Sequence, residues 1–338
     1  MSAYVLVSAS GGSLGLLAGG SLTQAIDWHW IFFVNLPIGV AAIVAARAVI
    51  PHRPGIGLGA GIDVAGALLV TVATGAGLLA VLQAPEEGWT SVRTLWLGTL
   101  SLALLTAFAV LESRLANPIL PPRVLRLRGF AGSSAIRAVL GIGLYACFFL
   151  GALYLQRVLG YGTLQTGAAF LPQTLIVGAL TLGPTARLVA RYGPVRTMFG
   201  GLAATVAGLL LLANADAGYF PAVFVAFLLL GAGGGTAMLP LLTIAMRDVP
   251  ARDAGVASAI VNVSLYLSGA FGLAVLGAVA SDRSRALAAR GWAPDHALAA
   301  GYHLAFAVAA ACVAACLAAA LVRQGIVTGA ITTGLWRR

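Results

Sequence analysis

The sequence contains very little charge. Of its 338 residues only 9% are Asp, Glu, Lys or Arg, whereas soluble domains contain about 25%. Lysine is absent, so all 20 basic residues are arginine, and there are only ten acidic residues and three cysteines. Hydrophobic residues make up 60% of the chain and the mean hydropathy is +0.97. This balance excludes a soluble globular fold and predicts a membrane protein.

The few charges leave long apolar stretches between them. A helix needs about 20 mostly apolar residues to cross a hydrocarbon layer of roughly 30 Å. The charge-poor stretches therefore predict an all-α, polytopic protein with about ten membrane-spanning helices. These helices are expected near residues 2–24, 30–50, 64–84, 92–111, 130–156, 163–186, 196–214, 219–246, 254–280 and 299–322.

The net charge of +10 would suit a nucleic-acid partner, but the arginines stand between apolar stretches, where they set membrane topology instead. Alternate connections place fourteen arginines on one side of the membrane and five on the other. The five are Arg93, Arg157, Arg283, Arg285 and Arg290. Because cytoplasmic loops are rich in Arg and Lys, both termini are predicted to be cytoplasmic and no nucleic-acid partner is expected.

The scarce reactive residues give no sign of an enzyme. Cys147, Cys312 and Cys316 all lie within apolar stretches and are interpreted as small buried hydrophobes. No Ser/His/Asp grouping is visible, and the four histidines have no metal-ligand spacing with carboxylates. The sequence therefore predicts no catalytic residues, no metal and no cofactor.

Titratable groups are also scarce inside the predicted spans. All ten acidic residues lie in or beside connections, and only His303 stands where a proton-carrying group would be expected. A packed or hydrogen-bonded histidine is the alternative interpretation of His303. The residues themselves thus predict no convincing proton relay.

The first apolar stretch contains glycines at four-residue spacing. Gly11, Gly15 and Gly19, with Gly20 beside them, share one helix face. Small residues at this spacing allow a second backbone to approach closely. A nucleotide-binding glycine loop fits less well, because no strand precedes the pattern. The pattern predicts a helix-packing face.

Arg137 is the one strong charge within a predicted span. Counting from Gly129 at ~1.5 Å per residue puts it roughly 12 Å along the helix, where an arginine costs about 2.5 to 3.5 kcal/mol. Two interpretations stay open. Arg137 either faces a central cavity and contacts substrate, or its guanidinium reaches the cytoplasmic headgroups.

Five further residues are candidates for substrate contact. Tyr145 and Phe149 add aromatic surface to the same span as Arg137, which suits flat hydrophobic or cationic ligands; packing or lipid contact is the alternative. Gln156, Gln173 and Asn262 place amide groups in or near apolar helices, where each needs a partner. Hydrogen bonding between helices is the alternative for these three.

The residues after the glycine pattern make it more specific. They read Asp27-Trp-His-Trp-Ile-Phe-Phe-Val-Asn-Leu-Pro-Ile-Gly39. With the glycines, this segment resembles the antiporter motif of the fifth helix, and the start of the sixth, in drug:proton antiporters of the 14-helix branch of the major facilitator superfamily. Similar segments are Leu153-Tyr-Leu-Gln156 with Gly160-Tyr-Gly162, Gly167 to Pro172, Gly231-Ala-Gly-Gly-Gly235 with Pro240, and Gly255 to Asn262.

The resemblance implies a fold of two six-helix bundles that give alternating access to a central site. It further implies that the chain corresponds to helices five to fourteen and lacks the first four. Residues 1–50 would then be a remnant of the amino-terminal bundle, 51–128 an extra helix pair with a cytoplasmic linker, and 129–338 a complete carboxy-terminal six-helix bundle with a short tail.

The function implied is efflux of hydrophobic or cationic drugs in exchange for protons, with the chain inactive by itself. The expected partners are the lipid bilayer of the cell membrane, a small substrate and protons. The alternative is a non-transporting membrane fragment, or half of a split carrier whose partner is a separately encoded amino-terminal segment.

Overall fold

The computed structural model describes residues 15, 18–49, 63–115, 122–215 and 218–332, and in these residues it contains helices and turns but no strand. The all-α prediction is confirmed. Residues 18–25 are helical, and two shorter pieces follow, α2 (Trp30–Phe33) and α3 (Asn35–Val49). A hairpin comes next, formed by α4 (Val64–Glu87) and α5 (Val92–Arg114).

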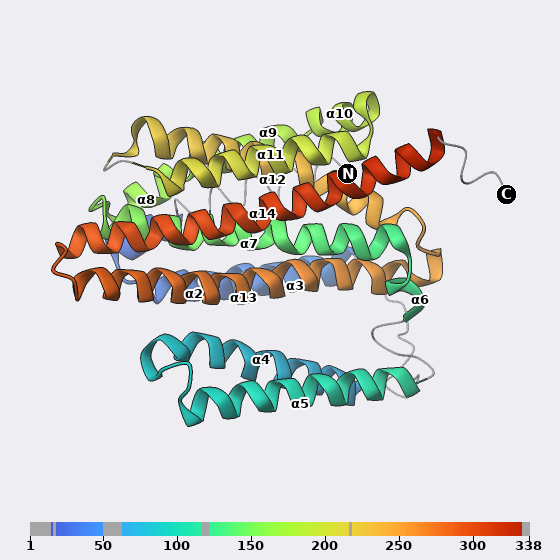
Figure 1. The fold of residues 1–338 in the computed structure, drawn as a ribbon, viewed down its shortest axis with the longest axis horizontal. Coiled ribbons are helices and arrows are strands. Elements are labelled where there is room, and N and C mark those ends of the chain that lie inside the picture. Colours follow the sequence, from blue (N-terminus) through green and yellow to red (C-terminus); the bar gives the residue numbers. More distant parts are fainter. Residues whose placement is uncertain (1–14, 16–17, 50–62, 116–121, 216–217, 333–338) are drawn as a thin grey trace.

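The remaining elements form a helical bundle (Figure 1). They are α6 (Pro122–Leu125), α7 (Arg128–Arg157), α8 (Thr163–Ala169), α9 (Leu171–Thr181), α10 (Pro184–Tyr192), α11 (Pro194–Ala213), η1 (Tyr219–Val223), α12 (Phe224–Met246), η2 (Ala251–Asp253), α13 (Ala254–Ala288) and α14 (Pro294–Thr332).

Eight helices among the described residues are long and apolar enough to cross a membrane, and a bent pair brings the number to nine. This makes the chain a multi-pass membrane protein. The first of the ten expected spans, residues 2–24, lies mostly outside the described residues. The predicted division of the chain after residues 50 and 128 stays a prediction.

The span expected over residues 163–186 is not one straight helix. Segment Thr163–Thr181 meets Pro184–Tyr192 at a bend of 55°. Pro184 causes the break, because proline has no backbone N–H and its ring clashes with the preceding turn. The short α10 that follows carries Arg187 and Arg191, so its polar face suits the membrane surface.

The last connection is shorter than predicted. Helix α13 continues to Ala288 instead of ending near residue 280, and α14 begins at Pro294 instead of near residue 299. At ~1.5 Å per residue, the 35 residues of α13 span about 52 Å, which exceeds the hydrocarbon thickness of roughly 30 Å. Arg283 and Arg285 therefore lie on a helix end that extends beyond the hydrocarbon layer.

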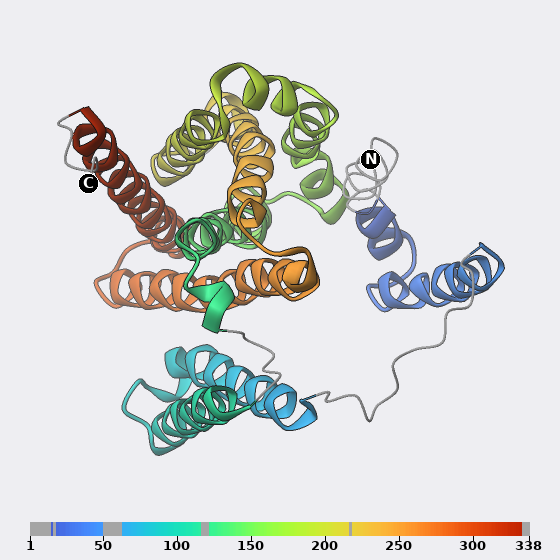
Figure 2. The ribbon, with the colours of Figure 1, turned by 90° about the vertical axis from the view of Figure 1, so that its right-hand side faces the viewer.

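Helix α7 lies at the centre of the bundle, between α13, α12 and α14 (Figure 2). Its buried side chains share one core with α11, α12 and α14. The largest fully buried members of this core include Leu140, Leu150, Leu155, Leu202, Leu209, Phe170, Phe227 and Phe306.

Glycine allows α11 and α12 to pack closely. A Cβ atom added at Gly208 would lie 2.9 Å from the Ala226 carbonyl oxygen, and one added at Gly233 would lie 2.8 Å from that of Gly201. Backbone approach of this kind stabilises helix pairs in lipid, where van der Waals packing replaces the hydrophobic driving force.

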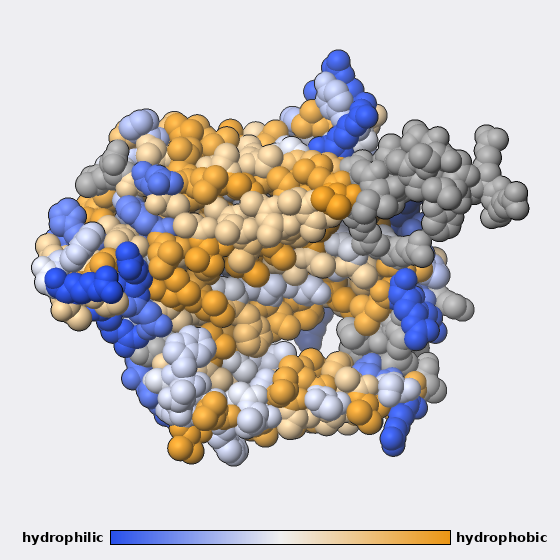
Figure 3. Space-filling model, in the orientation of Figure 1, coloured by the Kyte–Doolittle hydropathy of each residue, from blue (hydrophilic) through white to orange (hydrophobic). Residues whose placement is uncertain are grey.

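The α4–α5 hairpin lies beside α13 (Figure 2). Ser101 Oγ donates to the Ala73 carbonyl oxygen at 2.7 Å and holds the two helices of the hairpin together. A Cβ atom added at Gly77 would lie 3.3 Å from the Phe271 ring of α13. Hydrophobic residues cover the middle of the visible face of the molecule, with hydrophilic residues at both ends (Figure 3), as a membrane protein requires.

Candidate functional site

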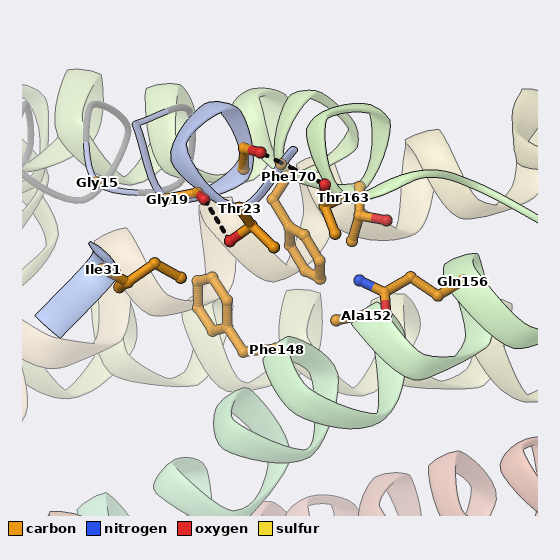
Figure 4. A pocket seen from close by; sticks show the side chains of 12 residues that line it. Gly15, Gly19, Thr23, Ile31, Phe148, Ala152, Gln156, Thr163 and Phe170 are labelled. Atoms are coloured by element: carbon orange, nitrogen blue, oxygen red, sulfur yellow. Dashed lines mark hydrogen bonds between the residues drawn. The ribbon is translucent and has the colours of Figure 1, made fainter. Parts of the chain in front are cut away.

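A pocket of about 360 Å³ lies between the glycine-rich helical residues 15 and 18–25 and the α7–α9 side of the bundle (Figure 4). Its walls come from parts of the sequence more than 100 residues apart. The lining residues are Gly15, Gly19, Gly20, Thr23 and Ile31 on one side, and Phe148, Ala152, Gln156, Thr163, Thr166, Gly167 and Phe170 on the other. We call it the glycine-helix pocket.

Gly20 forms the closest contact between the two walls. A Cβ atom added there would lie 3.1 Å from both Leu164 Cα and the Thr163 carbonyl oxygen. Thr163 Oγ1 also donates to the Gly20 carbonyl oxygen at 3.4 Å. At Gly15 and Gly19 an added Cβ would meet no atom within 4 Å, so these two glycines border open space. The predicted packing residue Gly11 lies outside the described residues.

An aromatic stack forms the opposite wall. Phe148 is 38% exposed, and its ring lies parallel to that of Phe170 at a centroid distance of 5.3 Å. Phe170 stacks in turn on buried Phe227 of α12 at 4.6 Å. The stack fixes the orientation of Phe148 and presents the face of an aromatic ring to the pocket. Such a wall suits flat apolar ligands and organic cations.

Polar atoms are few in this pocket. The amide of Gln156 lies at its edge, and Thr23 and Thr163 contribute hydroxyl groups (Figure 4). Thr23 Oγ1 already donates to the Gly19 carbonyl oxygen at 2.8 Å, so Gln156 is the side chain with amide donors and an acceptor at this edge. The lining is therefore mostly apolar, with a small number of hydrogen-bonding groups, as is typical of small-molecule sites.

Arg137 does not line this pocket. Its side chain is 9% exposed, and Nη1 donates to the Met238 carbonyl oxygen of α12 at 3.4 Å, while Nε is buried without a hydrogen-bond partner. The guanidinium thus packs against α12 close to Pro240. Both interpretations of Arg137 from the sequence stay predictions.

Tyr145 and Tyr266 form a second aromatic pair, with ring centroids 6.3 Å apart. Tyr145 packs over Gly269 of α13, where an added Cβ atom would lie 2.4 Å from its ring. Tyr266 is 62% exposed. Tyr266 is not among the residues predicted from the sequence, because a single tyrosine in an apolar helix gives no signal of its partner on another helix.

The other three candidates are separated from the glycine-helix pocket. Phe149 lines a different pocket between α4, α7, α13 and α14. Gln173 is 1% exposed and accepts a hydrogen bond from Cys147 Sγ at 3.6 Å, so it links α9 to α7. Asn262 donates to the Ser258 carbonyl oxygen at 3.0 Å within its own helix. Of the ten predicted site residues, the pocket brings together Gly15, Gly19, Gly20 and Gln156.

Several residues of the pocket carried no sequence signal. Thr23, Thr163 and Thr166 are ordinary residues in helical stretches, and only the packing of distant helices brings them together. Metal chemistry has no support in the described part of the chain, where no group of three or more His, Cys, Asp or Glu side chains could hold an ion.

The apolar spans, the small residues at helix contacts and a mostly apolar pocket between packed helices define a polytopic membrane protein with space for a small molecule between its helices. Comparison with known families agrees, because the profile of the Major Facilitator Superfamily matches residues 1–273. The chain belongs to this family. Membership of this family agrees with the expectation that the chain is not an enzyme.

Curated relatives carry drug-resistance names. The chain is 35% identical over 299 residues to the puromycin resistance protein pur8 of Streptomyces alboniger, covering 86% of this chain and 58% of the relative. It is 32% identical to the multidrug resistance protein Stp of Mycobacterium tuberculosis, with coverages of 82% and 51%. A third relative is the tetracenomycin C resistance and export protein of Streptomyces glaucescens, at 29% identity with coverages of 80% and 50%. The chain spans about half the length of these relatives.

Proposed function

We propose that the chain is part of a membrane carrier that exports hydrophobic or cationic small molecules, and that the glycine-helix pocket belongs to the export pathway. The observation that supports this most strongly is the pocket itself. A glycine-rich helix and the bundle border an open pocket of about 360 Å³ that is mostly apolar and has an aromatic wall. The names of the relatives, which include puromycin, tetracenomycin C and multidrug resistance, point in the same direction.

The mechanism proposed is alternating access, in which two helical bundles rock about a site between them. In this view residues 129–338 form one bundle, residues 1–50 belong to the other, and residues 51–128 add a helix pair and linker. The close contact of Gly20 with Thr163 and Leu164 lies on the line where the two bundles would move against each other. The aromatic wall would hold the substrate by stacking while the bundles rock.

Exchange for protons is the finer part of the proposal and rests on the resemblance of the glycine pattern and the Asp27–Gly39 segment to antiporters. We further propose that both termini are cytoplasmic. The distribution of arginines supports this orientation, with fourteen on that side and five on the other. A non-transporting protein, or half of a split carrier with a separate partner segment, is the competing proposal.

Two neighbouring residues offer a matched test of the pocket. Phe148 lines the glycine-helix pocket, whereas Phe149 faces the pocket beside α4. The gene at its native locus would be altered to Phe148→Ala or Phe149→Ala, and efflux of a fluorescent organic cation would be followed in cells. An aromatic contact is worth about 0.5 to 1.5 kcal/mol, so Phe148→Ala should weaken apparent affinity about two- to twelvefold.

The control Phe149→Ala should leave apparent affinity for the cation close to that of the unchanged protein. Equal losses in both variants would contradict the assignment of the pocket. Efflux identical to that of a strain lacking the gene, at normal protein abundance, would favour the non-transporting alternative. Efflux that persists after the proton gradient is collapsed would contradict proton exchange but leave the pocket assignment standing.

A further inference from the structure

A second pocket, of about 380 Å³, lies between α4, α7, α13 and α14. It is formed where α4 and α7 end, α13 nears its end and α14 begins. Its apolar lining includes Leu82, Leu150, Leu153 and Leu273. Glu86, Arg157, Ser281, Ser284, Arg285 and Tyr302 are its charged and polar lining residues. A site with both characters fits an amphipathic ligand.

The charged groups come from three different helices. Glu86 belongs to α4, while Arg157 ends α7 and Arg285 lies near the end of α13. Arg157 interacts with the Tyr302 hydroxyl of α14, and Arg285 Nη2 donates to Asp282 Oδ1 at 2.5 Å. The pocket lining therefore includes both guanidinium groups and a carboxylate. This arrangement complements a ligand that carries both a negative and a positive charge.

The membrane position of these arginines strengthens the argument. Arg157 and Arg285 are two of the five arginines on the predicted outer side, where arginine in short connections is disfavoured. A lipid phosphate at the interface can accept from the guanidinium N–H groups that are not used by Tyr302 and Asp282. The pocket lies between the hairpin and the bundle, at the end of the spans, which is the depth at which phospholipid headgroups lie.

We propose that this pocket binds the headgroup of an aminophospholipid of the phosphatidylethanolamine type. Its phosphate contacts Arg157 and Arg285, its ammonium group contacts Glu86, and the first part of its acyl chains lies along the leucines. A primary ammonium carries three N–H donors for a carboxylate, whereas the quaternary ammonium of phosphatidylcholine has none and phosphatidylglycerol has no cation.

The size of the pocket fits this assignment. Water occupies about 30 Å³ per molecule, so 380 Å³ corresponds to roughly a dozen heavy atoms, enough for a headgroup and glycerol but not for the whole lipid. The acyl chains would continue outward into the bilayer. The proposal concerns lipid binding alone and does not depend on transport.

The test measures which lipids remain bound to the protein. The full chain would be incorporated in vesicles of equal parts phosphatidylethanolamine, phosphatidylglycerol and phosphatidylcholine, extracted in mild detergent and examined by native mass spectrometry. Phosphatidylethanolamine should be retained in excess over the other two. Arg157→Gln should reduce total retained phospholipid about two- to fivefold, which corresponds to the loss of one partly exposed charge pair.

Glu86→Gln should have a different effect. It should leave phosphatidylglycerol retention unchanged and remove the excess of phosphatidylethanolamine, because only the ammonium contact is lost. The matched control is Arg93→Gln, since Arg93 is an exposed arginine near the same end, paired with Glu87 and outside the pocket lining; it should change nothing. Thermal unfolding of each variant verifies that it is folded.

Three outcomes would overturn the proposal. The retained lipid could match the vesicle composition, phosphatidylglycerol could be preferred, or Arg93→Gln could reduce retention as much as Arg157→Gln. Adding water-soluble glycerophosphoethanolamine tests whether the pocket recognises a free headgroup or a membrane lipid, because both have the same polar groups. If it displaces the lipid at equal concentration, the pocket recognises a free headgroup and not a membrane lipid.

Discussion

The span Trp30–Val49 and the span Gly129–Arg157 have nearly the same mean hydropathy, 1.9 and 2.1. Their environments differ completely. None of the most apolar 18-residue stretch is buried in the first span, whereas half of it is buried in the second. Hydropathy therefore reports that a helix can reside in a membrane, but not whether its side chains contact lipid or protein. In a bilayer both environments are apolar, so composition cannot separate them.

The largest expected difference between the two regions is in stability. Phe227 is fully buried in the bundle and stacks on Phe170, while Phe32 of α2 is 65% exposed. Phe227→Ala should destabilise the bundle by about 3 kcal/mol or more, because it leaves a cavity in a packed core. Phe32→Ala should change stability by less than about 0.5 kcal/mol. Thermal unfolding in detergent would measure both, and equal effects would contradict the comparison.

Glycine substitutions sharpen the contrast between packed and open faces. A Cβ atom at Gly269 would overlap the ring of Tyr145, but at Gly75 of α4 it would meet nothing within 4 Å. Gly269→Ala should cost about 1 to 3 kcal/mol through overpacking. Gly75→Ala should stabilise α4 by about 0.5 to 1 kcal/mol, because alanine is the better helix former. Unfolding in a denaturing detergent should show a lower free energy of unfolding for Gly269→Ala and a higher one for Gly75→Ala. A change of the same sign in both variants would argue against the α7–α13 contact.

Two ion pairs give a smaller comparison. Arg123 donates Nε and Nη2 to the carboxylate of Asp253 at 3.2 and 2.8 Å, and the Asp253 side chain is 5% exposed. Arg93 pairs with Glu87 at the exposed end of the hairpin. Arg123→Gln should cost about 1 kcal/mol, a value reduced because the arginine itself is largely exposed. Arg93→Gln should reduce the free energy of unfolding by roughly 0 to 0.5 kcal/mol. A larger loss of stability in Arg93→Gln than in Arg123→Gln, measured by thermal unfolding, would contradict this order.

The smallest effect concerns the turn before α2. The carboxylate of Asp27 accepts a hydrogen bond from the backbone N–H of His29 and forms a second one with the His29 side chain. These bonds, the backbone one most of all, lower the pKa of the Asp27 carboxyl below its usual value. A lowered pKa means that the hydrogen bonds stabilise the turn above the ordinary pKa and are lost as the pH falls through the lowered one. A ¹³C NMR titration of labelled aspartate should therefore find Asp27 titrating below a model peptide. A midpoint at or above that of the peptide would contradict the hydrogen bonds between His29 and Asp27.

Part of the candidate site could be read from the sequence. Glycines at four-residue spacing predicted a face for close packing, but Gly15 and Gly19 border open space, and it is the neighbouring Gly20 that lies close to α8. The aromatic and amide candidates were harder to place. Phe148 and Phe149 are adjacent, yet they line different pockets, because neighbouring residues on a helix point about 100° apart and only the packed neighbours decide which direction matters. The same limit applied to Arg137, whose partner is a backbone carbonyl 101 residues away.

The sequence by itself determined that the chain is helical and resides in a membrane, which side its arginines favour, and which family motifs it contains. These properties follow from local composition, because the bilayer demands long apolar stretches whose backbone is satisfied within each helix. Only the tertiary structure decided the break before Pro184, the length of α13, the position of Arg137 and the membership of the two pockets. These depend on which helices meet, and contacts between distant helices leave no periodic signal in an apolar sequence.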